Sequence, residues 1–295
     1  MLILISDAFD KSLPDKLKVF GEVTEDTSRL GEADVVLVRS KTKCTKEYID
    51  SAKNLKLIIR GGVGMDNIDR EYCKEKGIIA VNTPKSSAIA VAELAFALMI
   101  SVPNKIVYFD TTMKKGEWNK KTKRTELYGK RLALFGMGNI ARKVAERARA
   151  FGMDVVAYDK YVTSSDLAKM VATPEEAVEN ADYISMHLPL TEETNGMMNS
   201  ALISHMKRSP VIINTGRGKC VNERDMADAL KSGAVSHFCT DVYSVEPMEG
   251  DNPLLECDNI TLTPHVGANS VENLLRIGEE VVETIDNLKK EGKIQ

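Results

Sequence analysis

His265, Arg217 and Glu246 are the residues of this chain with the chemistry of a proton-transfer site. His265 lies in TPHVGA, Arg217 in INTGRG and Glu246 in DVYSVEP, each just beyond an apolar run predicted to form a strand. Imidazole exchanges protons near neutral pH, a carboxylate can orient it, and a guanidinium binds anionic groups. Each residue taken singly also has a purely structural explanation. His265 could cap a strand end, Glu246 could belong to a Glu-Pro turn, and Arg217 could form a surface salt bridge. Because consecutive parallel strands end on one edge of a sheet, the three together indicate a site there.

A glycine-rich turn predicts a nucleotide-binding loop. The stretch GMGNIA, from Gly136 to Ala141, follows the predicted strand 131–135 and opens the predicted helix 139–152. The first glycine permits a tight turn, the second lets a pyrophosphate approach the backbone, and the alanine is small enough for close helix–strand packing. The phosphates would lie at the helix N-terminus, where unpaired N–H groups favour an anion. The alternative for this spacing alone is a tight turn without a ligand.

Asp159 strengthens the nucleotide interpretation. It ends the next predicted strand, 154–158, and lies 159 − 138 = 21 residues after Gly138. An acid about 20 residues beyond the glycines binds the ribose hydroxyls of a dinucleotide. The same acid repels a 2′-phosphate, so NAD is favoured and NADP is less expected, although Lys160 beside it moderates that preference.

Alternating apolar and polar segments predict the elements that position these residues. Strands are predicted at 2–6, 34–38, 55–59, 78–81, 131–135, 154–158, 183–188, 210–214, 235–242 and 259–263. Helices are predicted at 69–77, 88–115 with an interruption near Pro103, 139–152, from Pro174, 223–233 and 271–290. Strands that alternate with helices are typical of parallel α/β units, and 295 residues favour two domains.

Composition limits the classes of partner and compartment. The formal net charge of −3 gives no electrostatic reason to expect nucleic acid or an acidic membrane as a partner. The five cysteines form no CxxC pair, which argues against a disulfide scaffold and a zinc site and favours a reducing cytoplasm, with no metal. Asp7 interrupts the N-terminal apolar run too early for a signal peptide, and the apolar stretch 88–102 is shorter than a membrane span.

The chain resembles the D-isomer-specific 2-hydroxyacid dehydrogenases over nearly its whole length. The matching stretches are VRSKTKCT (38–45), RGGVGMDNID (60–69), NTP (82–84), VAEL (91–94), GMGNIARKVAERARAFGMDVVAYD (136–159), HLPLTEET (187–194), NTGRG (214–218) and TPHVGA (263–268). The residues of VRSKTKCT and RGGVGMDNID are most similar to those of the phosphoglycerate and glycerate dehydrogenase branch. The resemblance implies two doubly wound parallel-sheet domains, with a Rossmann dinucleotide-binding domain inserted into a flavodoxin-like substrate domain. We expect a substrate domain over 1–98, an NAD-binding domain over 99–268 and a returning helix over 269–295.

The resemblance also implies a role for each site residue. His265 would be the general acid and base, Glu246 would orient it, and Arg217 would hold the substrate carboxylate and polarise the C2 oxygen. Asp241 would face the nicotinamide carboxamide. The cofactor contacts implied are Gly136, Gly138, Asn139, Ile140, Asp159, His187, Leu188, Pro189, Thr215, Asp241, His265, Gly267 and Ala268. The substrate contacts implied are Arg39, Arg60, Gly61, Gly62, Val63, Gly64 and Arg217. His205 and His237 match no motif.

The expected activity is NAD-dependent hydride transfer between a D-2-hydroxy acid, of the 3-phosphoglycerate or glycerate type, and its 2-oxo acid. A glyoxylate or hydroxypyruvate reductase is the alternative, because Ser86 and Ser87 stand where the phosphoglycerate branch carries glycine and asparagine. Gly216 replaces the usual alanine. An NAD-sensing, co-repressor-like binding protein is the alternative of another class, and the intact Arg217, Glu246 and His265 argue against it. The resemblance further implies a homodimer with 88–115 at its interface, and we expect no C-terminal regulatory domain.

Overall fold

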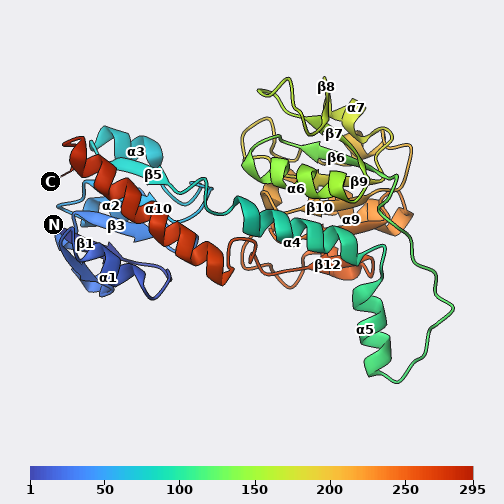
Figure 1. Ribbon diagram of the computed structural model, residues 1–295, viewed down its shortest axis with the longest axis horizontal. Helices are drawn as coiled ribbons and strands as arrows, with labels where there is room; N and C mark the ends of the chain where they lie inside the picture. Colours follow the sequence, from blue (N-terminus) through green and yellow to red (C-terminus); the bar gives the residue numbers. More distant parts are fainter. Residues whose placement is uncertain (295) are drawn as a thin grey trace. The chain divides into compact units, whose positions relative to one another are not determined.

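The computed structural model describes residues 1–294 and divides the chain into two compact units. Met1–Ala90 and the segment from Ala268 onward form the first unit, and Val91–Gly267 form the second, which is therefore inserted into the first (Figure 1). The predicted fold of two parallel-sheet domains is confirmed. The sequence places the first junction at 98/99, whereas the contacts divide the chain within helix α4 (Ala88–Ser101). From Ala92 onward, α4 packs into the core of the second unit.

The first unit is built on a five-stranded parallel sheet. Its strands are β1 (Leu2–Ile5), β2 (Glu22–Thr24), β3 (Val35–Val38), β4 (Leu57–Arg60) and β5 (Ile79–Asn82), in the order β2-β1-β3-β4-β5. This is the flavodoxin-like order. Helices α1 (Leu13–Leu17) and α10 (Val271–Lys290) cover one face, and α2 (Lys46–Ser51) and α3 (Arg70–Glu75) cover the other. Because both faces are covered, β1 and β3 are buried along their whole length, which their runs of aliphatic residues require.

The second unit is built on a seven-stranded parallel sheet. Its strands are β6 (Arg131–Phe135), β7 (Asp154–Tyr158), β8 (Lys169–Val171), β9 (Tyr183–Met186), β10 (Val211–Asn214), β11 (His237–Thr240) and β12 (Ile260–Leu262). Their order is β12-β11-β10-β9-β6-β7-β8. Counted from β6 this is 3-2-1-4-5-6 with one further edge strand, the order of the Rossmann fold. The order reverses between β6 and β9, and ligands of such sheets bind outside the strand ends at this point.

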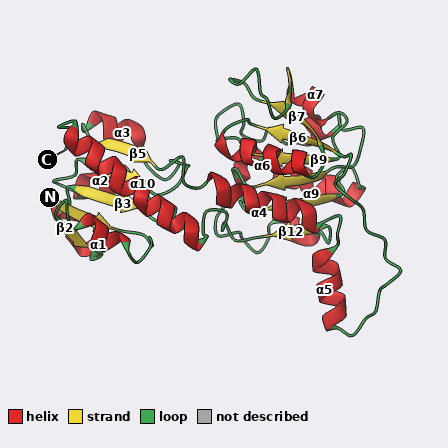
Figure 2. Cartoon of the chain, viewed as in Figure 1, coloured by secondary structure: helices red, strands yellow, loops and turns green. Residues whose placement is uncertain are grey.

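Helices cover both faces of the larger sheet (Figure 2). α4 and α6 (Asn139–Ala150) pack on one face, and α7 (Pro174–Val178), α8 (Ser200–Ile203) and α9 (Glu223–Ser232) pack on the other. The short 3-10 turns η1 (Thr27–Glu32), η2 (Gly218–Cys220) and η3 (Pro253–Glu256) complete the two units. Thr173 caps α7 by accepting a hydrogen bond from the N–H of Glu176.

Two strands were not predicted from the sequence. β2 and β8 are three residues long, lie at sheet edges and have no fully buried residue. Edge strands with little burial lack the apolar pattern by which strands are recognised. The predicted interruption near Pro103 is confirmed, because α4 ends at Ser101 and α5 (Ile106–Lys114) follows at an angle of 65°.

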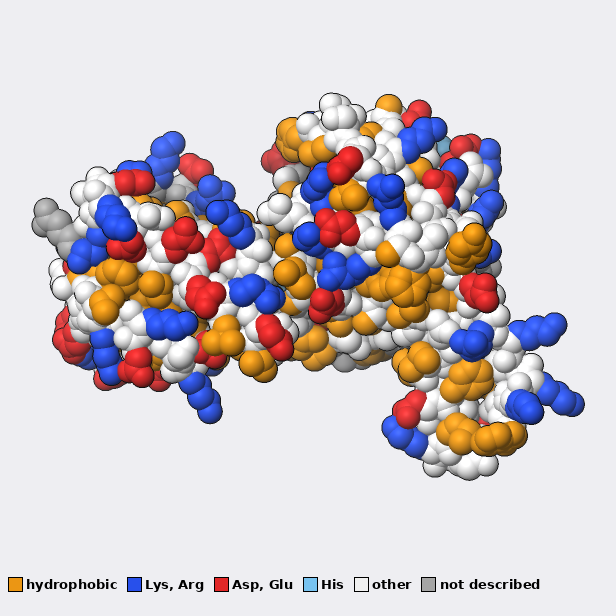
Figure 3. All heavy atoms as spheres, in the orientation of Figure 1, with side chains coloured by type: hydrophobic (Ala, Val, Ile, Leu, Met, Phe, Trp, Pro, Cys, Tyr) orange, Lys and Arg blue, Asp and Glu red, His pale blue; other side chains and the backbone are white. Residues whose placement is uncertain are grey.

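The segment from α5 to β6 stands away from the sheet of its own unit. Figure 2 shows it as a helix followed by an extended loop, and Figure 3 shows apolar side chains exposed over α5. Ile106 and Val107 on this helix are each 57% exposed, and Trp118 on the loop is 76% exposed. No single helix among residues 1–294 is long and apolar enough to cross a membrane, although the bent pair α4 and α5 passes that test together on length and composition.

Candidate active site

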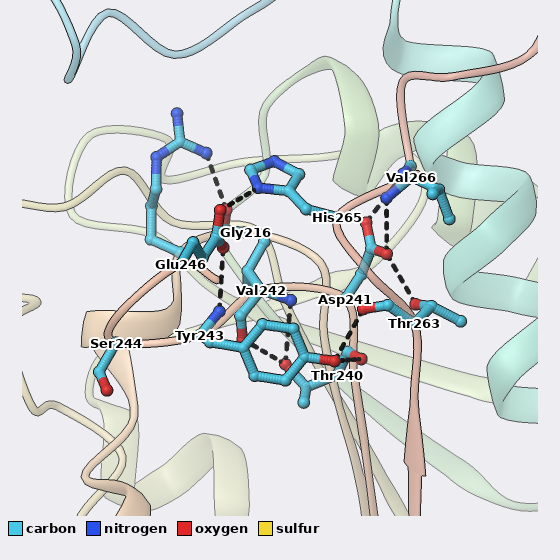
Figure 4. A network of polar contacts seen from close by, with 12 residues as sticks. Gly216, Thr240, Asp241, Val242, Tyr243, Ser244, Glu246, Thr263, His265 and Val266 are labelled. Atoms are coloured by element: carbon cyan, nitrogen blue, oxygen red, sulfur yellow. Dashed lines mark hydrogen bonds and ion pairs between the residues drawn. The ribbon is translucent and has the colours of Figure 1, made fainter. Parts of the chain in front are cut away.

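Three adjacent strand ends bring the predicted catalytic residues together. β11 pairs with β10 on one side and with β12 on the other, and Thr240 is aligned with Asn214 and with Leu262. The three strands therefore end at the same level. The loops that leave them carry Arg217, Glu246 and His265, and Figure 4 shows Glu246 and His265 side by side with residues that hold them. The register of the sheet thus gathers side chains separated by up to 48 residues in the sequence (265 − 217 = 48).

His265 and Glu246 form the pair expected of an oriented acid–base group. The Nδ1 atom of His265 lies 2.6 Å from Oε2 of Glu246, and each side chain is 37% exposed. The carboxylate can only accept, so Nδ1 carries a hydrogen and Nε2 is the ring atom that can exchange a proton.

Glu246 is held in its ionised form. Burial alone would raise its pKa, but the hydrogen bond and charge of His265, the N–H of Tyr243 and the charge of Arg217 together hold the pKa below the usual range of a glutamate. The Tyr243 N–H donates to Oε1 of Glu246 at 3.1 Å. Glu246 therefore remains a carboxylate at every pH at which a histidine of ordinary pKa titrates, and it can stabilise an imidazolium.

Asn214 shapes the turn that presents Arg217. Its Oδ1 accepts from the N–H of Gly216 at 3.0 Å, and its Nδ2 donates to the carbonyl of Arg217 at 3.0 Å. The guanidinium is half-buried, and its Nη1 donates to the Gly216 carbonyl at 2.7 Å. These contacts direct Arg217 toward Glu246, whose pKa it lowers.

Gly218 is required next to Arg217 by close backbone packing. A Cβ atom at this position would lie 2.0 Å from the carbonyl carbon of Tyr243, so the two backbone segments would have to separate. We expect Gly218→Ala to lower the free energy of unfolding by about 1–3 kcal/mol or more, the usual cost of overpacking. Urea unfolding measures this loss. Gly250→Ala is the matched control, because a Cβ atom there would meet no described atom within 4 Å, and equal losses in both variants would contradict the packing argument.

The backbone of His265 is itself unusual. Its φ of 53° lies in the left-handed region, which costs a residue other than glycine about 1–2 kcal/mol. Asp241, which is buried, holds the following residues in place. Its Oδ1 accepts from the Val266 N–H at 2.9 Å and the Thr263 hydroxyl at 2.6 Å, and its Oδ2 accepts from the Gly267 N–H at 2.8 Å. The strained histidine is therefore fixed by its surroundings rather than by its own preference.

The glycine loop at the point of strand reversal has the shape of a phosphate site. Gly136 has a φ of 93°, and a Cβ there would lie 3.0 Å from the carbonyl of His187. A Cβ at Gly138 would have no heavy atom of the described residues within 4 Å, so this side of the loop is open. Within residues 1–294 no side chain caps α6, which starts at Asn139, and its first N–H groups are available to an anion.

Asp159 lies where a ribose-binding acid is expected. Its Oδ2 accepts from the Met137 N–H of the glycine loop at 2.7 Å, and its Oδ1 accepts from the N–H groups of Tyr161 and Val162 at 2.8 and 3.0 Å. A carboxylate has about four acceptor positions, so one remains for a ligand hydroxyl. Lys160, the cation beside it, is engaged by Glu193.

Two unsatisfied polar atoms fit the binding of a dinucleotide here. Among the described residues, the Thr215 hydroxyl and Nδ1 of His187 are buried without a hydrogen-bond partner. His187 Nε2 lies 2.9 Å from the Ser185 hydroxyl, and burial lowers the pKa of the ring to about 4, so it is neutral. Because a buried polar group without a partner is costly, a ligand that supplies partners would be stabilised. Leu188 adjoins both glycine turns: its side chain lies 3.5 Å from the Cβ position of Gly136 and its carbonyl 3.2 Å from that of Gly216.

Apart from Arg217, the residues implied as substrate contacts lie in the first unit, at or just after the ends of β3 and β4. Arg39 follows β3, and its guanidinium donates to the carbonyls of Ala8 and Ala268 at 3.4 and 3.3 Å, while its Nε is buried without a partner among the described residues. Burial lowers the pKa of Arg39, and the charge of Asp7 opposes this. Arg60 ends β4, and its guanidinium lies against Gly62. Gly61, Gly62, Val63 and Gly64 form the loop that follows.

Several residues of the site were not singled out from the sequence. Tyr243, Thr263 and Asn214 all lie within the motifs quoted for their neighbours, but only the fold shows what they contact. The two histidines that match no motif have structural positions. Nε2 of His237 lies 2.9 Å from the Thr261 hydroxyl, and His205 is exposed just after α8. All five cysteines are free thiols, and no cluster of three or more metal-ligating side chains occurs within residues 1–294.

The second unit matches a known protein family. Residues 96–267 match the NAD-binding domain of the D-isomer specific 2-hydroxyacid dehydrogenases. The chain is 44% identical over 257 residues to a hydroxypyruvate reductase of Thermotoga maritima, covering 86% of this chain and 84% of that one. It is 40% identical over 296 residues to a D-3-phosphoglycerate dehydrogenase of Methanocaldococcus jannaschii, covering 96% of this chain and 56% of the relative. The chain thus spans little more than half the length of that relative.

The solved structures give the same result. A D-lactate dehydrogenase from Aquifex aeolicus, in complex with NAD and lactic acid, superposes with a TM-score of 0.85 at 30% identity, covering 99% of this chain and 96% of that one. The fold, the glycine loop and these relatives together define a dinucleotide-dependent oxidoreductase. The chain belongs to the D-isomer specific 2-hydroxyacid dehydrogenase family, its cofactor is NAD, and its substrate is a small 2-hydroxy or 2-oxo acid.

Proposed function

We propose that the chain transfers hydride between NAD and a D-2-hydroxy acid of the 3-phosphoglycerate or glycerate type, with His265 as the general acid and base. The observation that carries this proposal is the 2.6 Å contact between His265 Nδ1 and Glu246 Oε2, which leaves Nε2 for the substrate. NADH supplies the hydride to C2 of the 2-oxo acid. His265 donates the Nε2 proton to the C2 oxygen, and the reverse reaction returns that proton to Nε2.

Arg217 binds the substrate carboxylate and polarises the C2 oxygen in this proposal. A planar guanidinium forms paired, charge-assisted hydrogen bonds with a carboxylate, which a lysine cannot reproduce. The turn held by Asn214 supports this role because it fixes the base of the Arg217 side chain. The ionised Glu246 stabilises the positive charge on His265 when the ring carries its second proton.

For the cofactor, we propose that the pyrophosphate binds at Gly136, Gly138, Asn139 and Ile140, and that Asp159 accepts from a ribose hydroxyl. Thr215, His187, Leu188 and Pro189 would line the cofactor, and Gly267 and Ala268 would adjoin its nicotinamide end. Asp241 uses three acceptor positions on the loop that follows β12, which leaves one for the carboxamide. The Asp159 carboxylate and the ion pair of Lys160 with Glu193 both disfavour the 2′-phosphate of NADP.

The first unit is proposed as the substrate domain, with the loop Gly61–Gly64 contacting the carboxylate. Arg39 supports a phosphorylated substrate, because its donors are poorly satisfied by two long bonds to carbonyls. Ser86 and Ser87 do not weigh against it. The Ser86 hydroxyl bonds Glu280 of α10, and the Ser87 hydroxyl accepts from Asn273 of α10 at 3.3 Å, so both are engaged within their own unit.

Oxidation of NADH with hydroxypyruvate and with phosphohydroxypyruvate, measured side by side, tests the substrate. We expect the phosphorylated acid to be preferred, and Arg39→Leu to lower kcat/KM for it roughly 10–100-fold, the loss of a charge-assisted bond. Hydroxypyruvate, which has no phosphate, is the internal control in the same variant. Equal kcat/KM for both acids in the wild type would instead support a glyoxylate or hydroxypyruvate reductase, which the name of the Thermotoga relative favours. No turnover with any 2-oxo acid would support a binding protein.

We also propose a cytoplasmic homodimer with α4 and α5 at its interface. The exposed apolar side chains of α5 support the interface, and the free thiols support a reducing compartment. Light scattering during size-exclusion chromatography should give twice the 32.5 kDa of one chain, and a monomeric mass at working concentration would contradict the dimer.

A further inference from the structure

We propose that Tyr243 is a positioning residue for the acid–base pair, holding Glu246 through its backbone and the turn of His265 through its hydroxyl. This inference rests on the proposed function, because it assigns a role to Tyr243 only if His265 transfers the proton. The sequence motifs do not assign a role to Tyr243, and its side chain takes no part in the proposed hydride and proton transfer.

Tyr243 contacts Glu246 directly and the turn that carries His265 through Thr263, using separate groups. Its N–H donates to Oε1 of Glu246 at 3.1 Å, and its hydroxyl donates to the carbonyl of Thr263 at 2.7 Å. The same carbonyl accepts from the N–H of His265 at 3.1 Å. In Figure 4 the Tyr243 ring lies beneath the two loops and points its hydroxyl at the end of β12. One residue therefore joins the loop of the carboxylate to the turn of the histidine.

The hydroxyl of Tyr243 completes the set of contacts that fixes the strained turn. Asp241 holds this turn through the Thr263 side chain and the N–H groups of Val266 and Gly267. Among the described residues, no side chain other than Tyr243 donates to the Thr263 carbonyl. Because His265 has a left-handed φ, losing one of these contacts lets the turn relax toward ordinary backbone angles. Relaxation would lengthen the bond from Nδ1 to Glu246.

The hydroxyl stays protonated and remains a donor across the working pH range. Burial raises the pKa of Tyr243 to about 12, and the charges of Asp241, Glu246 and Glu223 add to this effect. Among the described residues of the second unit, the charge of Arg217 acts on the pair, Asp241 lies behind the turn, and Glu223 bonds the neighbouring Ser244. Tyr243→Phe removes none of these charges, so a change in the titration of His265 would report the geometry of the pair.

Tyr243→Phe tests the inference, with Tyr183→Phe as the matched control. Tyr183 is a tyrosine of the second unit that is more deeply buried than Tyr243, its pKa is likewise raised to about 12 by burial, and its hydroxyl bonds Thr125 away from the site. We expect Tyr243→Phe to lower kcat for reduction about five- to tenfold, as the loss of one neutral hydrogen bond would, with unchanged NADH affinity. The pH above which reduction declines should fall by about half a unit, because a weaker bond to Glu246 stabilises the imidazolium less. Tyr183→Phe should leave both quantities unchanged.

Histidine ring nitrogens give a readout that does not depend on turnover. The chain has four histidines, and burial lowers the pKa of His187 and His237 to about 4, which leaves His205 and His265 to be told apart by resonance assignment. NMR of the histidine-labelled protein with NADH should show a lower pKa for His265 in Tyr243→Phe than in the wild type. Unchanged kcat and an unchanged His265 titration would overturn the inference, as would equal activity losses in both variants without a shift.

A third variant separates this outcome from failure of the proposed function. His265→Gln is assayed in the same experiment. If it retains wild-type turnover, the proposed acid–base role is wrong. If it is inactive while Tyr243→Phe behaves like the wild type, only the positioning role of Tyr243 is wrong.

Discussion

Replacement of His265 by glutamine is expected to lower kcat for reduction of a 2-oxo acid by about 10²–10⁴-fold, the range of general acid–base catalysis. Glutamine preserves a hydrogen bond to Glu246 but cannot donate a titrating proton. The affinity for NADH should stay within about twofold, because the glycine loop and Asp159 lie at β6 and β7 rather than at β12. Stopped-flow or steady-state kinetics, together with NADH fluorescence titration, measure the two effects separately.

The pH dependence of the wild-type rate tests the same acid–base role of His265. Reduction needs the protonated ring, so its rate should fall as pH rises, and oxidation should show the opposite trend. Glu246 contributes no titration there, because its pKa lies below the usual range and it is ionised throughout. The dependence should disappear in His265→Gln. A variant that keeps both its turnover and its pH dependence would remove His265 from the mechanism.

Replacement of Arg217 by alanine is expected to lower kcat/KM by about 10²–10⁴-fold, the equivalent of two charge-assisted hydrogen bonds. Arg217→Lys keeps the charge but not the planar fork, so we expect it to recover only part of the loss. Part of the effect should fall on KM, through the carboxylate, and part on kcat, through the C2 oxygen. Steady-state kinetics measures the changes in KM and in kcat separately. The same assay with added guanidinium ions shows whether a free ion can replace the missing side-chain group.

Lys219→Ala is the matched control for Arg217. Lys219 is an exposed cation two residues further along the same turn, and its removal changes the net charge equally. We expect its kinetics to match those of the wild type. Comparable losses in Arg217→Ala and Lys219→Ala would show that general electrostatic attraction, rather than a directed contact, explains the effect.

The elements with strong apolar patterns were predictable from the sequence, and the weak ones were not. β1, β3, β9 and β10 are buried along their whole length, so each appears in the sequence as a short, mainly apolar run. α10 begins and ends at the predicted residues because Ser270 caps it and its apolar face is periodic. β2 and β8 depend on pairing with one neighbour at a sheet edge, and no local pattern marks such strands.

The sequence by itself determined the family, the cofactor loop and the three residues proposed for catalysis, because these depend on residue types at short spacings within motifs. Only the tertiary structure decided how the site is held. The hydroxyl of Tyr243 reaches Thr263 across 20 positions, and Asp241 reaches Val266 and Gly267 across 25 and 26. These contacts exist because β11 and β12 pair in parallel register and end together. Short-range sequence patterns do not predict which strands pair. The conformation of His265 therefore depends on the pairing of β11 and β12 and on the contacts that this pairing makes possible.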